Sequence, residues 1–101
     1  MRLVDIDSTH MVDKDGNPAG GLTVGPGMRL EWQNGPSDIQ TGAVVEQVIE
    51  AIVDRLRFYQ EGKFASEYNE AAINYLRGAK RVLNERTADR EARGVEGTHE
   101  V

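Results

Sequence analysis

Residues 41–93, TGAVVEQVIEAIVDRLRFYQEGKFASEYNEAAINYLRGAKRVLNERTADREAR, decide the fold of this chain. Apolar residues recur in this stretch at spacings of three and four, which is typical of amphipathic helices. The pattern predicts one helix over about 42–60 and a second over about 67–93, with Thr41 and Ser66 as their N-caps. Because the link between them is short, the two helices are expected to form a long antiparallel hairpin.

Each expected helix carries an apolar stripe that would face the other helix. The apolar residues Val44, Ile73, Tyr75 and Leu76 cannot all face the partner helix of the same chain. We therefore expect the N-terminal strands and other subunits to cover what remains. The expected stripes are Val45, Val48, Ile49, Ile52, Val53, Leu56 and Tyr59 in the first helix, and Tyr68, Ala72, Tyr75 or Leu76, Ala79, and Val82 or Leu83 in the second.

The N-terminal part holds all three prolines and more than half of the glycines, a composition that favours short strands and turns. Alternation of apolar and polar residues over Met1–Asp7 predicts a strand, and Leu22–Val24 and Met28–Trp32 predict two more. Between them, Asp13–Asn17 reads DKDGN, in which Asp-Gly is a strong hairpin signal.

The two parts together predict an α+β fold. A small N-terminal antiparallel β region with turns would occupy residues 1–40, and the helical hairpin with a ligand-binding C-terminal loop would occupy residues 41–101. A chain of 101 residues with 39% hydrophobic residues has a thin core, so an oligomer is expected.

The spacing of Asp13, Asp15 and Asn17 also resembles the start of a calcium loop. An EF-hand requires glycine at its sixth position and a bidentate carboxylate at its twelfth. Counted from Asp13, these positions hold Pro18 and Val24. A hairpin turn is therefore favoured, and no metal site is expected.

Charge and composition exclude several classes of partner. The net charge of −5 argues against binding to polymeric DNA or RNA and to anionic membranes. Residues 77–93 nevertheless carry six basic and three acidic side chains, so a site for a small anion is expected there.

No apolar run approaches the roughly 20 residues that span a bilayer, and Asp5 and Asp7 interrupt any signal peptide. The expectation is a soluble, intracellular protein.

The sequence offers little for catalysis. It contains no cysteine, which excludes disulfides, thiolate nucleophiles and cysteine zinc sites. Its two histidines, His10 and His99, lie near the chain ends, where a general base would be poorly held. We expect a protein that is not an enzyme and that uses no cofactor.

The end of the second helix can be interpreted in two ways. Arg86, Arg90 and Arg93 recur at spacings of four and three among acidic residues, which by itself favours a solvated, salt-bridged helix end with a disordered tail. Alternatively, the arginines would hold phosphate oxygens in bidentate fashion. In that case backbone amides around Gly94 and Gly97, with the side chains of Thr98 and His99, would complete a site for a phosphorylated ligand that contains a base.

A ring for stacking the base is available in Phe58, Tyr59 or Phe64 at the hairpin tip, although core packing is preferred for Phe64. Asn69 and Arg86 lie 17 residues apart on one expected helix, which corresponds to about 25 Å. A nucleotide-sized ligand cannot reach both in one subunit. If the hairpin tip and the arginines at the end of the second helix share a site, two subunits must contribute to it.

Three segments, LEWQNGP from Leu30, VIEAIVDRLRFYQEGKF and NERTADREARGVEGTH, resemble the helical hairpin of phage anti-Thoeris proteins. Those proteins act as sponges: they sequester cyclic ADP-ribose signals made by TIR-domain defence enzymes. The same class of hairpin occurs in a phage anti-CBASS protein that captures cyclic oligonucleotides. The resemblance covers residues 30–99 and is most specific in the last segment, and it does not extend to residues 1–29.

The resemblance implies a phage protein in the host bacterial cytoplasm that binds a cyclic ADP-ribose signal at the subunit interfaces of a homo-hexamer, without turnover. The stretch PSDIQTG departs from the family, so contacts from residues 34–41 are in doubt. Capture of cyclic di- or trinucleotides, and an oligomeric interaction module without a ligand, remain the alternatives. The ligand-binding residues implied are Tyr59 (where phenylalanine is usual), Asn69, Arg86, Arg90, Arg93, Glu96, Gly97, Thr98 and His99.

Overall fold

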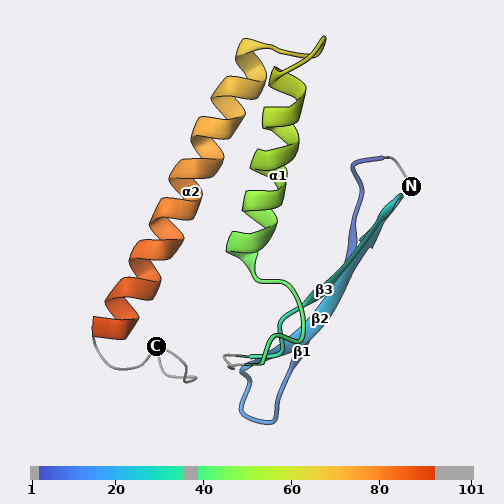
Figure 1. The fold of residues 1–101 in the computed structure, drawn as a ribbon. Coiled ribbons are helices and arrows are strands. Elements are labelled where there is room, and N and C mark those ends of the chain that lie inside the picture. The colour runs from blue at the N-terminus through green and yellow to red at the C-terminus, as the bar shows by residue number, and fades with distance from the viewer. Residues whose placement is uncertain (1–2, 36–38, 93–101) are drawn as a thin grey trace. The chain divides into compact units, whose positions relative to one another are not determined.

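The computed structural model describes residues 3–35 and 39–92, with only the backbone of Arg90. Three strands are followed by two helices, which confirms the expected α+β class (Figure 1). The chain divides into two compact units between Val44 and Val45. The elements are β1 (Asp7–Val12), β2 (Pro18–Gly25), β3 (Met28–Trp32), α1 (Val45–Gln60) and α2 (Glu67–Ala92).

The first unit is a three-stranded antiparallel sheet in the order β1-β2-β3. Ser8, Thr23 and Leu30 lie opposite one another across the three strands. Thr23 is buried at 5% exposure, and its hydroxyl accepts a hydrogen bond from the indole N–H of Trp32 at 2.8 Å. A second bond of 2.7 Å joins the Thr23 and Ser8 hydroxyls, so both polar groups on this face are satisfied.

The expected turn and the strands that follow it are confirmed, but the strand expected over residues 1–7 is wrong. The carboxylate of Asp13 accepts hydrogen bonds from the backbone N–H groups of Asp15 and Asn17, at 2.9 and 3.0 Å. This turn makes the residues just before Asp13 the neighbours of β2, so the strand begins at Asp7. Alternation of residue type identified a strand near the N-terminus, but the turn decides its register.

Thr41 does not cap α1, and the expected start of the helix at residue 42 is also wrong. Ala43 pairs with Trp32 in a parallel bridge. The Ala43 N–H donates to the Glu31 carbonyl at 2.8 Å, and the Ala43 carbonyl accepts from the Gln33 N–H at 2.9 Å. The bridge therefore ties Ala43 to the edge of the sheet, and α1 begins at Val45.

The second unit is the helical hairpin of α1 and α2. Val53 on α1 and Ile73 on α2 are its buried apolar side chains, at 2% and 4% exposure. On α1, the expected stripe is confirmed at its centre, although Val45 and Ile52 are about half exposed. The Ser66 cap is confirmed by a bond of 3.0 Å from the Asn69 backbone N–H to the Ser66 hydroxyl.

The stripe expected on α2 is only partly right. Ile73, Leu76 and Leu83 turn inward, whereas Tyr68 and Tyr75 are 87% and 81% exposed. Ala79 and Val82 are exposed as well. Neighbouring residues such as Tyr75 and Leu76 point about 100° apart around the helix. The sequence left open which of them faces α1, and the packing of the hairpin selects Leu76.

Neither helix is long and apolar enough, over the residues described, to serve as a membrane span. The same residues contain no group of three or more histidine, aspartate or glutamate side chains placed to hold a metal ion.

Candidate functional site

The tip of the hairpin contains a pocket of about 330 Å³. It lies where α1 ends at Gln60 and the chain turns before α2 begins at Glu67. All five residues of the connection, 61–65, are exposed. The pocket is lined by Phe58, Tyr59, Glu61, Gly62, Lys63 and Phe64.

Three aromatic rings line the pocket, those of Phe58, Tyr59 and Phe64. The centroid of Tyr59 lies 6.2 Å from that of Phe58, with a tilt of 52°, and 6.4 Å from that of Phe64, in an edge-on arrangement at 70°. Phe64 is 76% exposed, so the expectation that it packs in the core is wrong. The helix has already ended before Phe64, so its ring does not join the seam between the helices.

Arg55 adds a positive charge beside these rings. It was not among the residues expected at the site. Its guanidinium carbon lies 5.0 Å from the Phe58 centroid and 5.1 Å from the Tyr59 centroid, within the range of cation–π attraction. The Nε–H of Arg55 donates to the Tyr59 hydroxyl at 3.3 Å. Spacings of three and four along a helix were the available signal, since they place Arg55 next to both rings.

Asn69 reaches the tip through a network of side-chain amides. Its Nδ2 donates to the Gln60 Oε1 at 3.0 Å and to the Phe64 carbonyl oxygen at 2.7 Å. Gln60 in turn pairs with the Ser66 backbone, accepting from its N–H at 2.8 Å and donating to its carbonyl at 3.0 Å. The structure thus brings Tyr59 and Asn69 to one end of the hairpin, as expected for a shared site.

Arg86 lies near the other end of α2. It is 17 positions after Asn69 on one continuous helix, a separation of about 25 Å. Its guanidinium is 3.9 Å from the Glu46 carboxylate in the first turn of α1, and the Arg86 side chain is 56% exposed. The tip residues and Arg86 therefore do not meet in one chain.

The remaining predicted ligand contacts can be located only in part. Arg90 lies on α2, one turn beyond Arg86. Arg93, Glu96, Gly97, Thr98 and His99 lie outside the described residues.

One ion pair on the hairpin has a clear electrostatic effect. Lys80 Nζ lies 2.7 Å from Glu50 Oε2 across the two helices. The hydrogen bond and the charge of Lys80, with a smaller contribution from Arg57, lower the pKa of Glu50 from its usual value. In this cluster the Glu50 carboxylate and the Lys80 ammonium are paired with each other.

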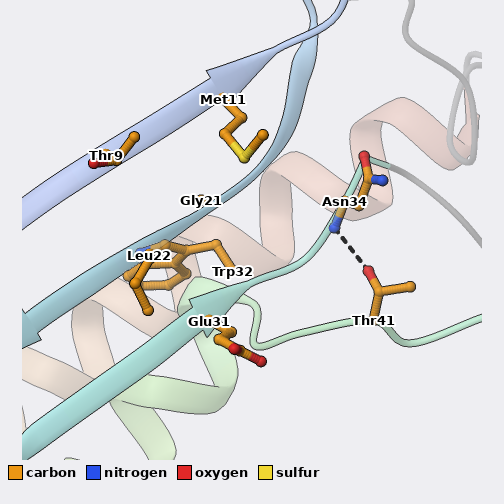
Figure 2. Close-up of a pocket in the computed structure, with 8 residues that line it drawn as sticks. All are labelled: Thr9, Met11, Gly21, Leu22, Glu31, Trp32, Asn34 and Thr41. Carbon is orange, nitrogen blue, oxygen red and sulfur yellow. Dashed lines mark hydrogen bonds between the residues drawn. The ribbon is translucent and has the colours of Figure 1, made fainter.

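The sheet unit contains a second pocket, of about 430 Å³ (Figure 2). At its rim the Asn34 backbone N–H donates to the Thr41 hydroxyl at 2.9 Å. None of the residues predicted to bind the ligand lines this pocket. It is lined by Thr9, Met11, Gly21, Leu22, Glu31, Trp32, Asn34 and Thr41.

Comparison with known proteins gives one informative relationship. No family model matches the chain. A curated protein named Thoeris anti-defense 1, from Bacillus phage SBSphiJ7, is 46% identical over 59 residues. The match covers 58% of this chain and 42% of the relative, so the matched region spans less than half of the relative's length. This confirms the resemblance: over more than half of its length, the chain is similar to an anti-Thoeris phage protein.

Proposed function

We propose that this chain is a phage anti-defence protein that binds a cyclic ADP-ribose signal and sequesters it without degrading it. The similarity to Thoeris anti-defense 1 carries this proposal, and the aromatic tip pocket supports it. Sequestration requires only tight binding, because the free signal must fall below the concentration that activates the host effector. Nanomolar affinity corresponds to about −12 kcal/mol.

At the tip, Tyr59 would stack on the adenine, a contact usually worth about 1–3 kcal/mol. Phe64 stands edge-on to Tyr59 and would border the stacked base. Asn69 would hydrogen-bond a ribose hydroxyl or a base edge, and Arg55 and Lys63 supply positive charge beside the pocket.

The phosphates would be held by the arginine end of a neighbouring subunit. Arg86 and Arg90 would contribute from α2, and Arg93, Glu96, Gly97, Thr98 and His99 would complete the contact. A second copy is needed because about 25 Å separate Asn69 from Arg86.

The exposed face of α2 supports such an assembly. Tyr68, Tyr75 and Val82 repeat every seven residues and form an exposed apolar stripe. Arg86 lies four residues after Val82 and continues the same face, so a helix packed on this stripe would also reach Arg86. A homo-oligomer, a hexamer by resemblance, would thus bury the stripe and complete the site together.

A release assay tests the function. The protein is incubated with cyclic ADP-ribose, removed from solution and heated, and the released molecule is identified by mass spectrometry. Intact ligand supports the sponge, a hydrolysed product indicates an enzyme, and no ligand indicates an interaction module.

Variants test the site. We expect Tyr59→Ala to weaken binding about 10- to 100-fold, since it removes one stacking contact. Arg86→Ala should weaken binding by about 1.5–3 kcal/mol through loss of a charge-assisted bond. Arg81→Ala removes an exposed arginine from the same helix and should bind like the wild type. Unchanged binding by both Tyr59→Ala and Arg86→Ala would show that the proposed site is wrong.

A second candidate ligand is a cyclic di- or trinucleotide. The exposed Arg86, with Arg90 one turn beyond it on α2, favours this candidate, since a basic helix end could hold the several phosphates of such a ligand. Competition between the two ligands in a binding titration separates them: mutual displacement indicates one shared site, and simultaneous binding indicates two.

A further inference from the structure

The connection that forms the pocket has little hydrophobic support of its own, apart from the edge-on contact of Phe64 with Tyr59. Residues 61–65 are exposed, so burial contributes little to their conformation. Three backbone bonds between 3.1 and 3.3 Å hold the turn: Glu61 to Phe58, Gly62 to Tyr59, and Ala65 to Gly62. None of these three bonds involves Phe64. Its carbonyl oxygen instead accepts a hydrogen bond from Asn69, which lies on α2.

Gln60 supplies the missing constraint. Its side-chain amide forms two antiparallel hydrogen bonds with Ser66, at 2.8 and 3.0 Å, and so joins the last residue of α1 to the cap of α2. The same Oε1 also accepts from Asn69 Nδ2, and Nε2 lies 3.4 Å from the Glu70 carboxylate. Gln60 and Asn69 are both only partly exposed, in contrast to the connection they enclose.

The orientation of the Asn69 amide follows from its partners. A backbone carbonyl oxygen can only accept, so the Asn69 atom 2.7 Å from the Phe64 oxygen must be the nitrogen. Both Nδ2 protons are then used, one on Phe64 and one on Gln60. Over the described residues Asn69 Oδ1 has no protein partner, so this side chain can meet a ligand only as an acceptor.

From these contacts we infer that Gln60 is a positioning residue of the tip site. It does not line the pocket. It anchors Asn69 and Ser66, and through Asn69 it fixes Phe64 beside Tyr59 before any ligand arrives. Asn69 does not line the pocket either. A ligand that extends from the pocket to Asn69 would meet its Oδ1 acceptor, so it would need an N–H or O–H there. This inference rests on the proposed function of the tip.

Association kinetics test the inference. If the tip is competent only part of the time in Gln60→Ala, the association rate for cyclic ADP-ribose should fall about tenfold while the dissociation rate changes little. Tyr59→Ala removes a direct contact and should instead raise the dissociation rate. Asn74→Ala, which removes an exposed amide from α2, should match the wild type in both rates.

Hydrogen exchange gives a readout that needs no ligand. In the free protein the Ser66 amide should exchange about tenfold faster in Gln60→Ala than in the wild type or Asn74→Ala, because its acceptor is lost. Gln60→Glu retains the Oε1 acceptor for Ser66 and Asn69 but loses the Nε2 donor, so both its exchange and its association rate should be intermediate.

The outcomes separate the two proposals. Unchanged Ser66 exchange or an unchanged association rate in Gln60→Ala would overturn the positioning role, even if the wild type binds the ligand. Absence of ligand binding by the wild type would overturn the proposed function, and with it any role of Gln60 in binding. Faster exchange in Gln60→Ala would then still show that Gln60 holds the tip.

Discussion

Gly21 and Gly42 lie where other backbone atoms occupy the space that a side chain would need. A Cβ on Gly21 would be 2.5 Å from the carbonyl oxygen of Thr9, and Gly21 has a φ of +153°. A Cβ on Gly42 would be 2.5 Å from the carbonyl carbon of Trp32, beside the bridge to Ala43. Backbone atoms cannot move aside as a flexible side chain can, so both glycines are required by close approach.

We expect Gly21→Ala to destabilise the sheet unit by about 1–3 kcal/mol, the usual cost of forcing extra volume into a packed site. Urea unfolding followed by the fluorescence of Trp32, the single tryptophan, measures this effect in the sheet. Gly78→Ala is the matched control, because open space surrounds Gly78 on α2. That change should stabilise the hairpin by about 0.5–1 kcal/mol, as measured by helical circular dichroism. A tolerated Gly21→Ala would mean that the strands can separate at little cost.

At the scale of elements, α1 and α2 are joined by a thin apolar seam and by charges across it. Two ion pairs join the helices among the described residues: Lys80 with Glu50 at 2.7 Å, and Arg86 with Glu46 at 3.9 Å. Both members of the shorter pair are partly exposed, so screening keeps its contribution to stability small. Its effect on titration is nevertheless measurable.

Lys80→Gln should raise the pKa of Glu50 back toward its usual value, because it removes the hydrogen bond and charge that lower it. Since the folded pKa lies below the unfolded one, the pair stabilises the hairpin at neutral pH. This contribution is lost as the pH falls through the folded pKa of Glu50. NMR titration of the Glu50 carboxyl measures the shift, and Arg81→Gln provides the control. An unchanged pKa in Lys80→Gln would contradict the pairing.

At the scale of the whole molecule, the exposed surface of α2 has two different characters. One side carries the stripe of Tyr68, Tyr75 and Val82, and the side away from it carries charged residues such as Glu70 and Arg77. An exposed apolar stripe of this length is typical of a helix that packs against a partner. A thin core and an unpartnered stripe together favour an assembly of several copies.

Tyr75→Glu should shift the protein toward smaller species in analytical ultracentrifugation, because a buried charge at a subunit contact is costly. Arg77→Glu changes charge on the opposite side and should leave the mass unchanged. If the site is shared between subunits, Tyr75→Glu should also lose ligand affinity, although Tyr75 does not line the tip pocket. A wild-type protein that sediments as a monomer would contradict the shared site.

The local features of this fold could be read from the sequence. Helix periodicity, the Asp13–Asn17 turn and the Ser66 cap depend on neighbouring residues, so they could be predicted, as could the distance between Asn69 and Arg86. Features that depend on distant partners could not be read in this way: the register of β1, the bonding of Thr41, and the inward face of α2 at Ile73. The tertiary structure also revealed Arg55 and Gln60 at the tip. The contacts of Arg55 lie within α1, where its spacing to the two rings was the available signal. Gln60 acts through contacts across a turn, which form only once the hairpin has closed.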